Sequence, residues 1–119
     1  MKVLFTTNGD NLDSRIDPRF GRSQKFLLLD TQTNQIVAHD NSQNLNALQG
    51  AGVQAARNAV DLGAEAVVTG HVGPKAFAAL LAAKIKVYIN ASGTIKEALE
   101  KLNSGGLELA NRPDVQGHW

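Results

Sequence analysis

The first forty residues contain three short apolar runs separated by polar, turn-rich segments. Residues 2–7 (KVLFTT) are rich in β-branched and aromatic side chains and lead into the turn sequence NGD, as expected of a buried strand. Residues 25–30 (KFLLLD) and 35–40 (QIVAHD) are similar runs, and the polar segment 31–34 between them is a good hairpin connection. The pattern predicts three strands, of which the second and third are antiparallel neighbours.

The second half of the chain alternates between helical and extended patterns. Apolar residues recur every three or four positions in the helical segments, and Thr94 with Glu97 forms a capping box typical of a helix start. The predicted order is helix 51–62, strand 64–69, helix 74–83, strand 85–89 and helix 94–102. The whole chain therefore reads βββαβαβα, which predicts a five-stranded mixed sheet with helices on both faces, a three-layer α/β/α fold. We expect one domain over residues 1–106 and a C-terminal tail over 107–119.

Composition excludes several classes of function. A chain of 119 residues forms one domain, and its net charge of +1 argues against a nucleic-acid binder or a basic protein of membrane surfaces. Cysteine is absent, which excludes disulfides, thiolate zinc sites and cysteine-ligated iron–sulfur clusters. The longest apolar run, 76–83, is too short to span a bilayer, and no secretory leader pattern is present, so we expect a cytoplasmic protein.

The predicted topology brings three helix starts to one edge of the sheet. Crossover connections make the first, fourth and fifth strands parallel, so their carboxyl ends share an edge. Glycine-containing helix starts follow at residues 50–52, 70–74 and 92–94. Main-chain N–H groups at helix starts attract anions, and ligands of open α/β sheets bind outside the carboxyl ends of strands. We expect an anionic ligand here; glycines that simply cap helices are the alternative.

Residues 14–22 (SRIDPRFGR) form the most distinctive segment of the chain. Three arginines flank an aromatic residue and a glycine, in a long loop that follows the first strand. Guanidinium groups bind polyanions through paired hydrogen bonds. The alternative is a solvated loop, or pairing of these arginines with Asp13 or Asp17.

No catalytic or metal-binding motif is complete. The three histidines, His39, His71 and His118, do not have the spacing of a local metal site. His71 lies in the predicted site loop, where a ligand contact and an ordinary loop role are equally open, whereas we expect His39 to be structural and His118 to be exposed. The chain lacks an assembled acid–base set, so we do not predict an enzyme.

The sequences DPRFGR at 17–22, GAG at 50–52, TGHVGPKA at 69–76 and GH at 117–118 together resemble the dinitrogenase iron–molybdenum cofactor biosynthesis family. This NifX-like group includes small stand-alone members and the molybdenum–copper orange-protein type. The resemblance implies a ribonuclease H-like fold with one antiparallel strand in the sheet. It also implies that the protein binds or carries a metal–sulfur cluster without catalysis, of the molybdenum–copper or iron–molybdenum type.

The resemblance also indicates how the cluster would be held. Many members have histidine immediately before FGR, where this chain has Arg19, and thiolate ligation is impossible without cysteine. We therefore expect noncovalent binding by charge and main-chain N–H groups, which suits a thiomolybdate-type cluster because its sulfides already fill the metal valences. The expected cluster-binding residues are Arg19, Phe20, Gly21, Arg22, Gly50, Gly52, Gly70, His71, Val72, Gly73, Lys75, Ser92, Gly93 and Thr94, with His71 and His118 as candidate metal ligands.

The partners follow from the same resemblance. They would be a ParA/MinD-like ATPase or a protein that receives the cofactor, and we expect neither nucleic acid nor membrane as a partner and a monomer or weak dimer. The alternative is a protein-interaction or regulatory module that serves an ATPase without a metal.

Overall fold

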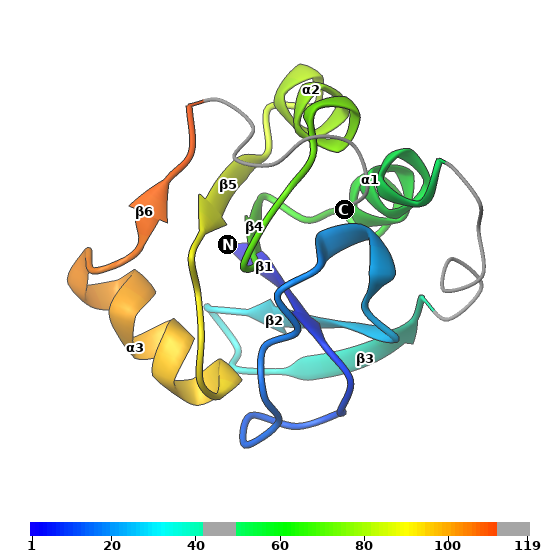
Figure 1. Cartoon of the computed structure of the whole chain (residues 1–119). Helices are drawn as coiled ribbons and strands as arrows, with labels where there is room; N and C mark the ends of the chain where they lie inside the picture. Colours follow the sequence, from blue (N-terminus) through cyan, green and yellow to red (C-terminus); the bar gives the residue numbers. More distant parts are fainter. Residues whose placement is uncertain (42–49, 112–119) are drawn as a thin grey trace.

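The computed structural model describes residues 1–41 and 50–111 and is built on a six-stranded mixed sheet of order β3-β2-β1-β4-β5-β6 (Figure 1). The strands are β1 (Lys2–Thr7), β2 (Lys25–Asp30), β3 (Ile36–Asp40), β4 (Ala66–Val68), β5 (Lys86–Ile89) and β6 (Glu108–Leu109). β2 pairs antiparallel with β1 and β3, whereas β1, β4 and β5 are parallel neighbours. The predicted hairpin and the predicted parallel strands are confirmed.

The predicted count of five strands is wrong, because β6 adds a sixth. Its residues Glu108 and Leu109 pair antiparallel with the end of β5, and the Ala110 N–H donates to the Val87 carbonyl at 2.8 Å. Two strands, β2 and β6, therefore run against the other four. Two residues are too few to produce a strand periodicity, so the sequence pattern alone predicts a tail from residue 107. The ribonuclease H-like motif and the domain boundary at residue 106 stay predictions.

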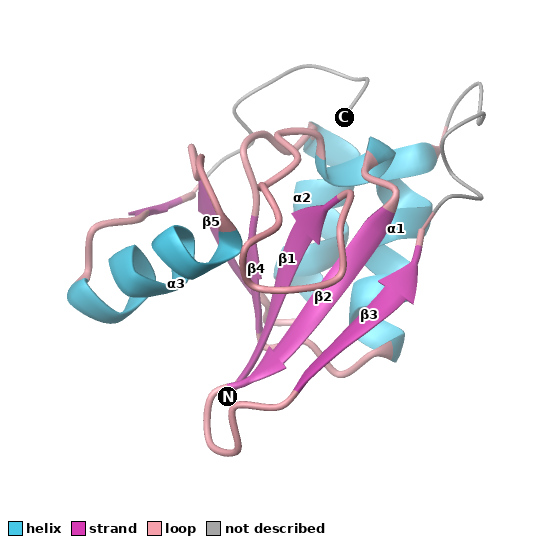
Figure 2. Ribbon diagram, turned by 90° about the horizontal axis from the view of Figure 1, so that it is seen from below, coloured by secondary structure: helices cyan, strands magenta, loops and turns pink. Residues whose placement is uncertain are grey.

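The helices lie on both faces of the sheet, as predicted (Figure 2). α1 (Ala51–Asp61) and α2 (Pro74–Ala82) cover one face, and α3 (Ile95–Ser104) covers the other. Pro74 is the first residue of α2, where no N–H is needed for the helix. The capping box at α3 is present, and Gly105 ends that helix with a φ of 78°. No helix in the described ranges is long and apolar enough to cross a bilayer.

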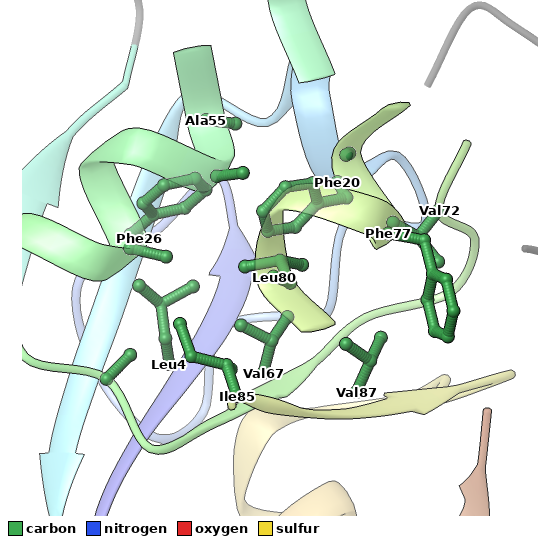
Figure 3. Close-up of a cluster of buried hydrophobic side chains, with 14 of the residues drawn as sticks. Leu4, Phe20, Phe26, Ala55, Val67, Val72, Phe77, Leu80, Ile85 and Val87 are labelled. Atoms are coloured by element: carbon green, nitrogen blue, oxygen red, sulfur yellow. The ribbon is translucent and has the colours of Figure 1, made fainter. Parts of the chain in front are cut away.

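A turn of 3-10 helix, η1 (Phe20–Arg22), connects the loop after β1 to the core on the α1 and α2 face. Phe20 is fully buried there, and its ring stacks on that of Phe26 with centroids 5.7 Å apart. Figure 3 shows both rings beside Ala55 and Leu80 of the covering helices. The long loop is therefore attached to the core by an aromatic side chain from its own sequence.

Candidate functional site

The arginine loop, which we define as residues 14–22, lies over the carboxyl end of β1. The Asp17 N–H donates to the Thr6 carbonyl at 2.8 Å, and the Thr6 hydroxyl donates to the Asp17 carbonyl at 2.7 Å. The Thr7 hydroxyl donates to the carbonyl of Arg15 at 2.8 Å. The last two residues of β1 thus hold the loop through both main-chain and side-chain groups.

The same loop is bonded to the connection between β4 and α2. The His71 N–H donates to the Pro18 carbonyl at 2.7 Å, and the Phe20 N–H donates to the His71 carbonyl at 3.3 Å. Arg19 and His71 thereby form an isolated parallel bridge. Gly70 allows this approach, because a Cβ at that position would lie 2.6 Å from the Pro18 Cα. The structure therefore brings together the two segments that carry most of the expected site residues.

A third set of bonds connects the loop region to the start of α3. The N–H groups of residues 95–97, the first turn of α3, donate to the Ser14 carbonyl, the Leu12 carbonyl and the Thr94 hydroxyl at 2.9, 2.9 and 3.1 Å. These donors were the reason to expect anion binding at residues 92–94. They are already satisfied within the protein, so this helix start positions the arginine loop and has no free first-turn donor for an anion.

Glu97 places a negative charge at this helix start. Its carboxylate accepts hydrogen bonds from the Thr94 N–H at 3.0 Å and the Thr94 hydroxyl at 3.1 Å. These two bonds, with a smaller effect of the nearby charges of Arg15 and Lys101, lower the pKa of Glu97 below its usual value of 4.5. An anionic ligand would be repelled here.

The lowered pKa of Glu97 predicts an acid-dependent loss of stability. The ionised carboxylate stabilises the fold at pH values above 4.5, and this contribution disappears as the pH falls through the lower pKa of the folded state. We expect Glu97→Gln to reduce the loss of stability between neutral and acid pH, as measured by urea unfolding at several pH values. Exposed Glu100 lies on the same helix, so Glu100→Gln is a matched control. Equal pH profiles for the two variants would contradict the prediction.

Arg19 is paired with Asp17, which was the alternative interpretation of the arginine segment. The guanidinium Nε and Nη2 each lie 3.3 Å from a carboxylate oxygen, and the Arg19 N–H donates to Asp17 Oδ1 at 2.9 Å. The Asp17 side chain is 2% exposed and that of Arg19 is 43% exposed. The guanidinium group of Arg19 therefore neutralises a buried carboxylate, so its attraction for an anionic ligand is reduced.

The start of α2 differs from that of α3, because no described residue accepts from its first-turn donors. Gly73 is the N-cap and Pro74 has no N–H, while the N–H groups of Lys75 and Ala76 have no acceptor among the described residues. The Lys75 side chain is exposed, and half-buried His71 precedes it in the same connection. This helix start combines main-chain donors with a cation, which is the arrangement that attracts anions.

The remaining expected residues divide into buried and exposed positions. Phe20, Gly21 and Val72 are buried, so the two side chains among them pack in the core and face no ligand. Gly50 precedes α1 with a φ of 81°, and Gly52 lies in the first turn of that helix, which packs against η1. His118 lies outside the described residues.

A hollow of about 580 Å³ opens between the end of β1 and the arginine loop. Its lining consists of Asn8, Gly9, Ser14, Arg15, Ile16, Asp17, Pro18 and Arg19. Among the residues that the structure describes, no group of three or more histidine, aspartate or glutamate side chains is placed to hold a metal ion. The described part of the site can therefore offer charge, hydrogen bonds and shape, but no cage of metal ligands.

Sequence reasoning missed the threonines that support this site. The buried hydroxyls of Thr6 and Thr69, at the ends of β1 and β4, lie 2.8 Å apart, and Thr6 also holds the arginine loop. The available signal was the position of polar residues at the ends of apolar strands, directly before the turn sequences. That signal marks a strand end, and only the folded chain shows that the two hydroxyls meet.

The chain has clear relatives among known proteins, two of them with solved structures. The orange protein from Desulfovibrio gigas, solved in its apo form, is 36% identical, with 96% of each chain covered and a TM-score of 0.93. The NMR structure of a NifB-like protein from Thermotoga is 29% identical, with 98% of each chain covered and a TM-score of 0.83. An uncharacterized protein of Methanocaldococcus jannaschii is 28% identical over 98 residues, which are 81% of this chain and 83% of that protein.

A family model agrees with these likenesses. Residues 1–105 match the model described as dinitrogenase iron–molybdenum cofactor, a range that includes the arginine loop and all three helix starts. The chain therefore belongs to the dinitrogenase iron–molybdenum cofactor family.

Proposed function

We propose that this protein binds an anionic, molybdenum-containing metal–sulfur cluster at the carboxyl edge of its sheet and carries it without catalysing a reaction. The observation that carries the proposal is the start of α2, where the N–H groups of Lys75 and Ala76 lack an acceptor among the described residues. An exposed ammonium group belongs to the same turn, and the arginine loop is bonded to the residues just before it. Membership of a cofactor-related family supports a cluster as the ligand.

The donor set favours noncovalent binding. The chain has no cysteine, and its described part has no cluster of three potential metal-ligating side chains. A cluster whose sulfides already complete the coordination of its metals needs only hydrogen-bond donors and positive charge from the protein. A cluster of the molybdenum–copper sulfide type meets this condition.

A carrier must both bind its ligand and release it, and a preformed site that makes no metal–protein bonds allows both. Hydrogen bonds to β1, to His71 and to α3 hold the arginine loop in place, so little ordering is required when a ligand binds. A ligand held without metal–protein bonds is released without breaking such bonds. We therefore include in the proposal a cytoplasmic partner that receives the cofactor.

The proposal is tested with two lysines near opposite ends of α2. Lys75 lies in the first turn, and Lys84 follows the end of the helix. The protein is incubated with tetrathiomolybdate and copper, desalted, and analysed for retained molybdenum, copper and visible absorbance. We expect Lys75→Ala to weaken retention roughly tenfold through the loss of a charge-assisted contact, and Lys84→Ala to behave as the unmodified protein.

A second pair of variants tests the arginine loop in the same assay. We expect Arg22→Ala to weaken retention more than His39→Ala, because Arg22 belongs to η1 and His39 lies on the edge strand β3. Equal retention in all four variants would contradict a site at this edge. An unmodified protein that retains neither metal after desalting would overturn the proposed function itself.

A further inference from the structure

The two edges of the sheet differ in how far they are protected from pairing with another chain. β6 is an edge of only two residues, whereas β3 has five and pairs only with β2 in the described sheet. The sequence of β3, IVAHD, contains no lysine or proline, and it pairs with β2 residue for residue without a bulge. Lysine, proline and bulges are features by which proteins usually protect an edge strand, and β3 has none of the three.

The hydrogen bonds at the two ends of this hairpin show which groups of β3 point outward. The Asp30 N–H donates to the Gln35 carbonyl at 3.0 Å, and the Asn41 N–H donates to the Gln24 carbonyl at 2.7 Å. Because hydrogen-bonded pairs alternate along an antiparallel ladder, the main-chain groups of residues 37 and 39 face β2. Those of Ile36 and Ala38 face away from the sheet, where another strand could pair with them.

A hollow of about 200 Å³ lies beside this edge, on the face that carries α1, and Figure 2 shows β3 as the outer strand next to this helix. Its lining is Phe26, His39, Asp40, Asn58, Asp61 and Leu62. Asp61 is the last residue of α1, and the last turn contains no basic residue. An aspartate at the negative end of the helix dipole is locally unfavourable, so the hollow beside Asp61 is a favourable place for a cation.

We propose that the β3 edge binds an extended basic segment of a partner protein as an added strand, with a lysine or arginine side chain of that segment in the hollow. The main-chain groups of Ile36 and Ala38 would supply the pairing, as in other complexes formed by strand addition. The carboxylate of Asp61 and the negative end of α1 would select the basic side chain. Val37, whose side chain is 53% exposed on the same face, adds an apolar contact.

A second copy of this chain fits the edge poorly. Residues 36–40 contain no lysine or arginine, so a self-paired β3 would bring no cation to either hollow. It would instead add a second Asp61 to the face that carries α1, where like charges repel. The charge pattern therefore favours a basic partner.

The test uses two capped hexapeptides, one of alternating valine and lysine and one of alternating valine and glutamate. Binding is followed by fluorescence anisotropy, and amide hydrogen exchange is measured by NMR. We expect the lysine peptide to bind and to slow exchange at Ile36 and Ala38, while residues 37 and 39, which are already paired with β2, change little. Asp61→Asn is expected to weaken this binding about threefold to tenfold, without any effect on molybdenum retention.

Ala38→Pro provides the sharpest variant. It removes one outward N–H, and proline is tolerated at such positions of an edge strand; Ala38→Ser keeps the N–H and is the matched control. We expect binding of the lysine peptide to be lost in Ala38→Pro and kept in Ala38→Ser. Equal binding of both peptides, unchanged exchange at Ile36 and Ala38, or a self-association that only Ala38→Pro abolishes would each overturn the proposal. The exchange experiment on the unmodified protein decides the question even if Ala38→Pro does not fold.

Discussion

Phe20→Ala is expected to destabilise the protein by about 3–5 kcal/mol, the cost of removing a large buried aromatic side chain and leaving a cavity. Phe20 is fully buried, and its ring stacks on Phe26 at 5.7 Å. The same side chain attaches the arginine loop to the core, so the loop should lose its order at the same time. The urea midpoint measures the first effect, and amide exchange at residues 15–17 and 19 measures the second.

The control for this prediction is Phe20→Leu, which keeps most of the buried apolar volume and should cost much less. We expect the melting temperature of Phe20→Ala to fall by roughly 10–20 °C, given the usual entropy of unfolding of a domain of this size. A variant that unfolds at the same urea concentration as the unmodified protein would show that η1 is not packed as described.

Gly70→Ala is expected to destabilise the fold and to reduce cluster retention together. The new Cβ would lie 2.6 Å from the Pro18 Cα and 2.8 Å from its carbonyl oxygen, distances that require the backbone to move. The bond from the His71 N–H to the Pro18 carbonyl, 2.7 Å long, would then be stretched or lost. Overpacking of this kind costs about 1–3 kcal/mol, which urea unfolding measures.

Gly106→Ala is the matched control, since a Cβ there would meet other atoms only at 3.6 Å, an ordinary contact distance. Neither glycine has a positive φ, so the comparison isolates the close approach of Pro18 from any backbone strain. If both variants unfold at the same denaturant concentration and retain the same amount of molybdenum, the loop does not depend on Gly70.

Most of the fold could be predicted from local patterns. The hairpin of β2 and β3, the parallel strands and the three helices follow from apolar periodicity and from capping residues, with bounds that differ from the structure by at most two residues. β6 could not be predicted, because its two residues become a strand only through pairing with Tyr88 and Ile89. Such a strand has no pattern of its own.

The site could be predicted only in outline. The arginine segment and the helix starts at the carboxyl edge could be recognised in the sequence. The sequence did not show which helix start has first-turn donors without an acceptor among the described residues. The donors of α3 are satisfied by carbonyls of Leu12 and Ser14, more than eighty residues away along the chain. The sequence left Asp13 and Asp17 open as partners of the arginines. In the structure Arg19 pairs with Asp17, whose carboxylate is buried.

The sequence by itself determined the order of the helices and of every strand except β6, the absence of thiolate ligands and the location of an arginine-rich loop after the first strand. Each of these depends on residues that are neighbours in the chain or on composition alone. Tertiary structure decided that the carboxylate paired with Arg19 is buried, that α3 uses its donors to hold the loop, and that the first-turn donors of α2 have no acceptor in residues 1–41 and 50–111. Hydrogen bonds and ion pairs join groups that lie close in space, so their partners become known only when the strands bring distant segments together.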